Sequence, residues 1–248
     1  MPAEPWLLMY HSVTGYTEDP YRITVTPDRL RRQLRWLAGR GLRGVGVAEL
    51  LRERAAGRGS RLVGLTFDDG YADFTENAVP LLREHGFRAT VFVVPGCLGG
   101  DNGWDPLGPR KPLLTEEGIR AAVVAGMEVG SHGMLHVSLP EAEDATLREE
   151  TVHSRELVGE ITGRPVHGYC YAYGHVDARA IAAVRSAGYA YACAIDPGPL
   201  TGPFALPRIH VDDRDTSLRL TVKRLLHPVR RRARPGTTAG APLAGAGR

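Results

Sequence analysis

Short runs of apolar residues alternate along most of the chain with segments whose apolar residues recur at helical spacing. The short runs predict strands, and the amphipathic segments between them predict helices. Residues 89–94, ATVFVV, are almost wholly apolar, which is typical of a strand buried on both faces of a parallel sheet. The predicted strands are 6–10, 61–67, 89–94, 127–131, 166–172, 189–194 and 204–211.

The segments between these strands carry helix start signals. In TPDRLRRQLRWLAGRG, we expect Thr26 at the N-cap and Pro27 in the first turn. Thr115 is expected to cap a helix that reaches Ala125. Further helices are predicted at about 71–86, 142–162 and 177–187.

This repeated βα pattern predicts a parallel sheet covered by helices. Roughly seven strands, with no strong linker before residue 218, favour a closed or nearly closed barrel over an open doubly wound sheet. In either architecture the active site lies at the C-terminal ends of the strands. We therefore predict one catalytic domain over residues 1–218.

Charge changes this picture only at the C-terminus. The 248 residues are 43% hydrophobic and 24% charged, which is ordinary for a globular protein. Residues 219–248 hold eight Lys and Arg and no Asp or Glu, so the first 218 residues carry −5 although the chain carries +3. Nucleic-acid binding by the body is therefore not expected. We expect 219–248 to be a disordered basic tail, or in part a short basic helix, either simply solvated or in weak contact with an anionic surface.

Cysteine usage and hydropathy exclude further classes. Cys97, Cys170 and Cys193 are an odd number without CxxC spacing, which indicates neither a disulfide framework nor a cysteine-based zinc site. No apolar run approaches about 18 residues, so no transmembrane segment is expected. The N-terminus lacks the basic segment of a signal peptide. The sequence as it stands predicts a cytoplasmic protein, and a wrongly chosen start codon would instead allow export or surface association.

Two pairs of chemically active residues follow predicted strands. Asp68 and Asp69 are adjacent, and their repulsion raises one pKa unless a cation or hydrogen bonds offset it. His132 and His136 are four residues apart, which on a helical turn places both imidazoles on one face. Each motif alone is common in turns and on polar surfaces. Together, at the ends of parallel strands, they predict a site for one divalent metal, Zn²⁺ by preference with Co²⁺ or Ni²⁺ as alternatives, in which one Asp is a ligand and the other a free base.

The motifs TFDDG and SHGMLH resemble those of the polysaccharide deacetylases, the NodB-homology domain of carbohydrate esterase family 4. Residues 62–195 fit that pattern. The resemblance implies an α/β fold of the distorted (β/α)7 barrel type. It also implies that Asp68 is the general base and that Asp69, His132 and His136 bind the metal.

A third motif, YCYAYG at residues 169–174, is similar to the form found in the poly-N-acetylglucosamine deacetylase branch. Cys170 stands where many members carry Arg, and Ala172 stands where Pro is usual. By resemblance, the backbone N–H of Tyr173 helps to bind the oxyanion. In that branch the strand bearing the catalytic histidine comes first in the chain, and His11 in LMYHSV matches it as general acid. The alternative for His11 is a strand-end histidine that bonds a neighbouring loop.

The implied reaction removes N-acetyl groups from a glycan that contains N-acetylglucosamine, with a metal-activated water as nucleophile. Candidate substrate-binding residues are Tyr173, Trp104 and Arg208. Trp104 either stacks on a sugar ring or covers the core. Arg208, in LPRIH, either orients Asp68 in place of the motif arginine or makes a plain ion pair. Two rival hypotheses are a hydrolase of a small non-sugar amide and a degenerate glycan-binding protein without turnover.

Overall fold

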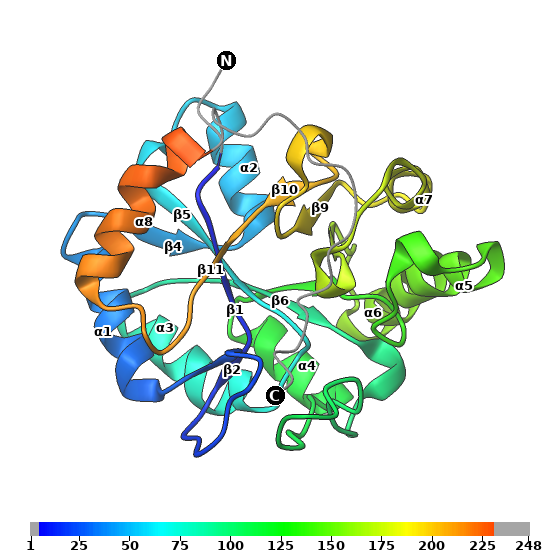
Figure 1. Cartoon of the computed structure of the whole chain (residues 1–248), viewed down its shortest axis with the longest axis horizontal. Coiled ribbons are helices and arrows are strands. Elements are labelled where there is room, and N and C mark those ends of the chain that lie inside the picture. The colour runs from blue at the N-terminus through cyan, green and yellow to red at the C-terminus, as the bar shows by residue number, and fades with distance from the viewer. Residues whose placement is uncertain (1–4, 231–248) are drawn as a thin grey trace, which may run out of the picture.

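The computed structural model of the chain describes residues 5–230 (Figure 1). Its main sheet has nine strands, and all of their pairings are parallel. The strands are β1 (Leu7–Tyr10), β4 (Arg43–Val45), β5 (Leu62–Phe67), β6 (Thr90–Val93), β7 (Glu128–Ser131), β8 (Gly168–Cys170), β9 (Tyr191–Ala194), β10 (Leu206–Pro207) and β11 (Ile209–His210). A separate pair, β2 (Ser12–Val13) and β3 (Thr24–Val25), lies beyond the end of β1.

The sheet closes into a nearly complete barrel. Its order is β10-β9-β8-β7-β6-β5-β1-β11, with β4 beside β5. β10 and β11 are successive halves of one extended segment broken at Arg208. Leu206 pairs with Cys193 of β9, and Ile209 pairs with Leu8 of β1. This segment therefore joins both ends of the sheet, and the predicted (β/α)7-type barrel is confirmed.

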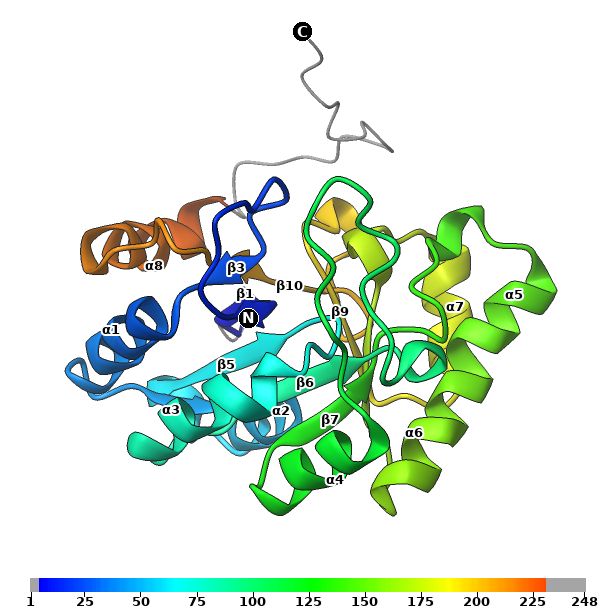
Figure 2. The same cartoon turned by 90° about the horizontal axis from the view of Figure 1, so that it is seen from below.

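Helices surround the barrel (Figures 1 and 2). Those in the described part of the chain are α1 (Pro27–Ala38), α2 (Val47–Ala55), α3 (Val79–Glu84), α4 (Glu116–Val124), α5 (Asp144–Arg148), α6 (Ser154–Thr162), α7 (Ala178–Ser186) and α8 (Ser217–Arg230). Thr26 caps α1 as predicted, because its side chain accepts a hydrogen bond from the Arg29 N–H. Thr115 caps α4 in the same way through the Gly118 N–H.

Two predicted helices contain a π-helical turn. The helix predicted at 142–162 consists of α5, a π turn over Glu149–His153, and α6. The helix predicted at 71–86 consists of a π turn over Phe74–Ala78 followed by α3. Turns of this kind are rare and often lie near functional sites.

β4 and α2 were not predicted. β4 has only three residues, RGV, and the first is exposed, so it shows too little of the strand periodicity. α2 buries only Val47 and Leu50, and its N-cap Gly46 makes no side-chain cap hydrogen bond. The signals that define a helix in sequence are therefore weak there.

The predicted tail begins inside an ordered helix. α8 packs against α1, its Leu220 is fully buried, and Lys223 forms an ion pair with Asp215 at 2.6 Å. The prediction of disorder is therefore wrong for residues 219–230, where the short basic helix is found instead. Residues 231–248 of the predicted tail lie outside the described residues. None of the helices within 5–230 has the length and apolar character needed to cross a membrane.

Candidate active site at the C-terminal end of the barrel

Asp68 and Asp69 follow β5 at the C-terminal end of the barrel, and both are buried. Asp69 has a φ of +69°, in the left-handed region that non-glycine residues rarely adopt. The two side chains make separate sets of contacts. Asp68 contacts Arg208, whereas Asp69 contacts the two predicted histidine ligands.

The three predicted metal ligands lie together. Oδ1 of Asp69 is 3.3 Å from Nε2 of His132 and 3.4 Å from Nε2 of His136. The ligand atoms of all three lie within 4.8 Å of one another. Nδ1 of His132 donates a hydrogen bond of 2.8 Å to the Cys170 carbonyl, which leaves Nε2 free to bind a metal. One carboxylate and two imidazoles are a donor set for Zn²⁺ that keeps a further position for water or substrate, so these residues fit the implied ion.

The spacing of His132 and His136 suggested a helical turn, but the two histidines do not lie on one. Residues 132–137 form a loop after β7, and His136 has a φ of +62°. Glu150 shapes this loop, because its carboxylate accepts hydrogen bonds of 2.9 Å from the backbone N–H groups of Met134 and Leu135. The two imidazoles meet because the loop doubles back over this buried carboxylate.

Arg208 holds the Asp68 side chain through two hydrogen bonds. Its Nη1 and Nη2 donate to Oδ1 and Oδ2 of Asp68 at 2.5 and 2.7 Å. Further hydrogen bonds to the Thr66 hydroxyl and the Ala194 carbonyl fix the guanidinium. The Arg208 side chain is only 1% exposed, which favours the alternative of orienting Asp68 over the predicted contact with substrate.

The neighbouring charges explain how two adjacent carboxylates coexist. Burial alone would raise the pKa of Asp68, but the charges of Arg208, His132 and His11, together with the hydrogen bonds from Arg208, hold that pKa below its ordinary value. Burial also opposes the charge on Asp69, yet hydrogen bonds from His132 and His136 hold its pKa well below the ordinary value. Both carboxylates are therefore ionised at neutral pH.

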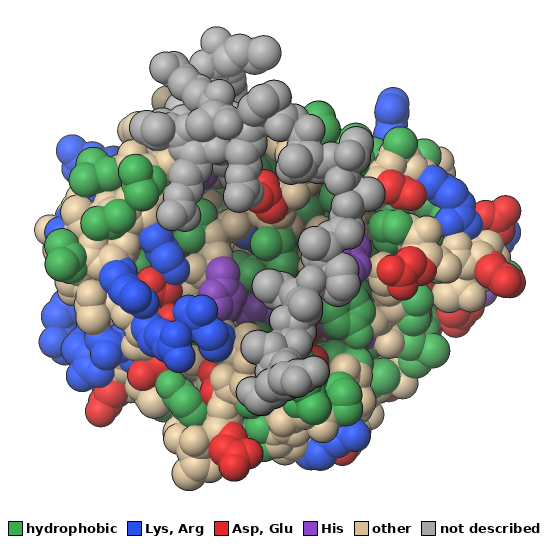
Figure 3. All heavy atoms as spheres, in the orientation of Figure 1, with side chains coloured by type: hydrophobic (Ala, Val, Ile, Leu, Met, Phe, Trp, Pro, Cys, Tyr) green, Lys and Arg blue, Asp and Glu red, His purple; other side chains and the backbone are tan. Residues whose placement is uncertain are grey.

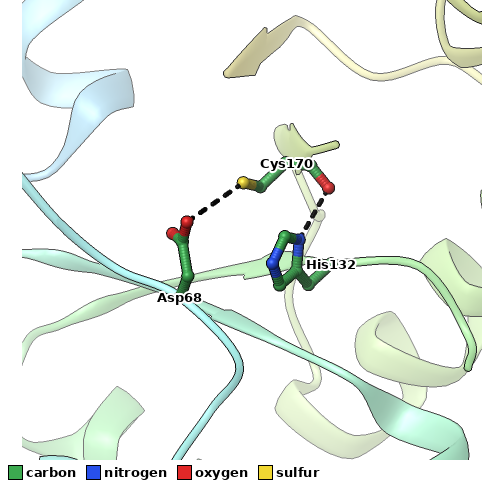
Figure 4. A group of neighbouring side chains, drawn as sticks. All are labelled: Asp68, His132 and Cys170. Atoms are coloured by element: carbon green, nitrogen blue, oxygen red, sulfur yellow. Dashed lines mark hydrogen bonds between the residues drawn. The ribbon is translucent and has the colours of Figure 1, made fainter. Parts of the chain in front are cut away.

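Cys170 lies between Asp68 and His132 (Figure 4). Its Sγ is 3.6 Å from Oδ2 of Asp68 and 3.0 Å from Nη2 of Arg208, while its carbonyl bonds His132. Asp68, His132 and Cys170 are close enough to one another to form a second possible metal-binding group. Because both oxygens of Asp68 already bond Arg208, the donor set built on Asp69 is better suited to an ion. Arg208 thus reaches the carboxylate that the motif arginine, replaced here by Cys170, would be expected to contact.

His11 follows β1 and lies beside Asp68, with 3.9 Å between Nε2 and Oδ2. Its Nδ1 is buried and has no hydrogen-bond partner within the described residues. The ring of His210 lies 6.2 Å away, centroid to centroid. Burial and the charge of His11 lower the pKa of His210 to about 4, so His210 is neutral at physiological pH.

Aromatic side chains flank His136. The ring of Trp104 stacks on it at 4.5 Å with 19° between the planes, and Tyr173 meets it edge-on at 4.6 Å. Tyr173 is 46% exposed, so its ring is accessible from solvent. Trp104 therefore contacts a predicted metal ligand, a role that neither sequence-based alternative included.

Lys111 was missed by the sequence analysis. It is buried, and its Nζ donates to the hydroxyls of Ser12 and Thr24 at 2.8 and 2.5 Å. These bonds tie the 99–112 loop, which carries Trp104, to the β2–β3 pair next to His11. A lone lysine in a polar loop gives no sequence signal of this contact.

Backbone strain is concentrated at the site. Four non-glycine residues in the described chain have a positive φ, namely Arg22, Asp69, His136 and Tyr173. Three of these are predicted site residues. Such conformations cost about 1–3 kcal/mol each and persist where the surrounding structure enforces them, often at active sites.

The family profile described as polysaccharide deacetylase matches residues 55–192 of this sequence. The chain belongs to the polysaccharide deacetylase family. This confirms the resemblance and the prediction of a hydrolase of the polysaccharide de-N-acetylase class. The metal that such an enzyme uses would be held by the Asp69 group described above.

Individual relatives agree with this membership. YxkH of Bacillus subtilis is 25% identical over 215 residues, covering 85% of this chain and 72% of YxkH. The poly-β-1,6-N-acetyl-D-glucosamine N-deacetylase of Staphylococcus aureus is 22% identical over 203 residues, covering 77% of this chain and 68% of that enzyme. The structure of the Streptococcus pyogenes deacetylase PplD in complex with acetate has the same fold. It superposes with a TM-score of 0.75 at 21% identity, covering 90% of this chain and 98% of PplD.

Proposed function

We propose that this polysaccharide deacetylase is a metal-dependent enzyme that removes N-acetyl groups from a glycan containing N-acetylglucosamine. The observation that carries the proposal is the separation of the two adjacent carboxylates. Asp69 faces two imidazoles, and Asp68 faces Arg208 and His11. A metal ligand and an unligated base are thereby supplied by consecutive residues.

Asp69, His132 and His136 would hold the metal, with Zn²⁺ as the first candidate and Co²⁺ or Ni²⁺ compatible with the same ligand types. A divalent ion bound there would lower the pKa of its water toward neutrality, which would supply a nucleophile at neutral pH. The ordered hydrogen bond from His132 to the Cys170 carbonyl supports this role, since it fixes the ring orientation.

Asp68 is assigned as the general base that takes the proton of the attacking water. Its low pKa suits a group that must be ionised before the reaction, and Arg208 keeps its oxygens in one orientation. His11 is assigned as the general acid that protonates the departing nitrogen through Nε2. General acid catalysis of this kind contributes about 10²–10⁴ in rate.

Tyr173 is assigned two contacts with substrate. Its left-handed backbone conformation is consistent with an N–H that donates to the oxyanion, and the loss of one such donor typically costs about 10²–10³ in rate. Its exposed ring, together with Trp104, offers aromatic surface to a sugar. The similarity to the Staphylococcus aureus enzyme supports an N-acetylglucosamine polymer as the substrate class.

The test is an assay of acetate release by the full chain, with Zn²⁺, Co²⁺ or Ni²⁺ added after chelation. Substrates are β-1,6- and β-1,4-linked N-acetylglucosamine oligosaccharides and a panel of small amides. Metal-dependent release from oligosaccharides supports the proposal. Release from small amides alone supports the rival amide hydrolase, and metal binding without release from any substrate supports the non-catalytic glycan-binding protein.

A further inference from the structure

Helix α8 leaves an apolar stripe uncovered. Leu218, Val222 and Leu225 are 72%, 46% and 68% exposed, whereas Leu220 is fully buried. Residues spaced by four and three positions lie on one side of a helix, so the three exposed side chains form a continuous line. Single exposed apolar residues are ordinary, but an aligned group on one helix points to an interaction surface.

This apolar stripe is bordered by positive charge. Arg219 lies next to Leu218 and forms no ion pair with any described residue. On the other border, Arg40 donates to the hydroxyl of Thr221 at 3.3 Å. The sequence from 216 to 248 contains no Asp or Glu, and Arg231, Arg232 and Arg234 follow the helix. Figure 3 shows hydrophobic side chains gathered over α8 with a group of Lys and Arg side chains near them.

We propose that α8 docks on an anionic lipid surface, with Leu218, Val222 and Leu225 buried at the level of the headgroups. A basic helix with one apolar face lies in the plane of such an interface. The flanking guanidinium groups would then contact lipid phosphates, each contributing about fivefold in affinity. No described helix is suited to crossing a membrane, so the contact is interfacial.

Charge disfavours two other partners for the apolar stripe, namely a second copy of the chain and the chain's own residues 231–248. In a two-fold dimer through α8, each basic border would face an equivalent basic border of the second copy. The chain's own residues 231–248 carry four Arg, no acidic residue and only one large apolar residue, Leu243. An anionic surface satisfies both the apolar stripe and its cationic borders.

The position of α8 relates this surface to the site. The 99–112 loop, which carries Trp104, and α8 both lie on the upper side of the molecule in Figure 2. Histidine side chains are also visible on the face that shows the α8 patch in Figure 3. Docking through α8 would therefore bring the opening of the site close to the lipid headgroups.

The test is co-sedimentation of the full chain with vesicles. Vesicles of phosphatidylglycerol and phosphatidylcholine should bind the protein, and binding should fall as salt is raised, whereas phosphatidylcholine alone should not bind it. Leu218→Ser with Leu225→Ser should weaken binding at least about tenfold, and Arg219→Gln about fivefold. Val124→Ser, which replaces an 87% exposed residue on α4, is the matched control and should bind as wild type.

The proposal does not depend on the assigned reaction, because the readout is lipid binding. Circular dichroism melting of each variant checks that it is folded. Absence of binding to the anionic vesicles overturns the proposal, as does binding that the double serine variant leaves unchanged. A wild-type dimer that the double serine variant dissociates, without any change in vesicle binding, would assign the stripe to a second copy instead.

Discussion

Arg208 binds both carboxylate oxygens of Asp68, at 2.5 and 2.7 Å, from the break between the two strand segments that close the barrel. A bidentate guanidinium–carboxylate pair fixes orientation as well as charge. Because Arg208 also bonds Thr66 and Ala194, the direction of the Asp68 side chain is set by the strands on both sides of the closure. Barrel closure and the position of the proposed base are therefore one structural feature.

Replacing Arg208 with Lys should lower kcat by about 10- to 100-fold, the range typical for residues that orient an active-site group. Lysine keeps the charge but not the two parallel hydrogen bonds. KM should change little, because the Arg208 side chain is buried. Steady-state kinetics with metal analysis measures both values. The control is Cys170→Ser, which keeps a small side chain beside Asp68 and should have a smaller effect. A change confined to KM would contradict the orienting role and would instead support a contact of Arg208 with substrate.

The neighbouring variants Asp68→Asn and Asp69→Asn should fail in different ways. Asn at 68 cannot accept a proton, so turnover should fall by at least about 10²-fold while metal remains bound. Asn at 69 should instead lose metal. Asp68→Asn also leaves the buried Arg208 without its counter-charge, so it should be destabilised by about 3–5 kcal/mol in urea unfolding. If both variants lose metal equally, or if Asp68→Asn turns over at the wild-type rate, the division of roles is wrong.

His136→Ala should abolish stoichiometric metal binding, since it removes one of the three proposed ligands. The matched control is His175→Ala. His175 lies near the same aromatic residues but bonds Ser138 and does not contact Asp69. Metal content after dialysis against a weak chelator, measured by atomic absorption, distinguishes the two. An unaltered metal content in His136→Ala would contradict the ligand assignment.

The barrel could be predicted from the sequence because its strands are local apolar runs. Residues 89–94 are all buried and contain β6, and Thr26 and Thr115 cap helices where their spacing indicated. The break of the last strand at Arg208 could not be predicted from the local sequence. An arginine within an apolar run is more often read as the point where a strand reaches the surface than as a buried residue. α8 was mispredicted for a related reason. Its order comes from long-range contacts with α1, not from composition.

That the proposed metal ligands lie together could be predicted because each follows a strand end, where parallel strands bring their loops together. The residues that support them could not. Glu150 reaches Met134 and Leu135 from a helix, and Lys111 reaches Ser12 from 99 positions away. Both are charged residues in polar segments, so their burial depends on the tertiary fold and leaves no periodic pattern. For the same reason, the sequence could not decide whether Arg208 orients Asp68 or makes a plain ion pair.

His210 should make the protein less stable in acid. Its pKa is lowered to about 4, first by burial and then by the charge of His11, while Asp212 opposes the shift and Lys223 adds to it. The unfolded chain, with a histidine pKa of about 6.5, therefore binds more protons between these two values. The contribution of a neutral His210 is complete above about pH 6.5 and is lost as the pH falls toward about 4.

Replacing His210 with Asn should remove this part of the acid sensitivity. Between about pH 7 and pH 4.5, wild type should lose about 2 kcal/mol more unfolding free energy than the variant, from about 1.4 kcal/mol per pKa unit. Urea unfolding at both pH values gives the difference, and His153→Asn, at an exposed position, is the control. Equal pH slopes in wild type and His210→Asn would mean that His210 is not kept neutral by the fold. A slope that changes in His153→Asn as well would instead assign the effect to net charge and not to His210.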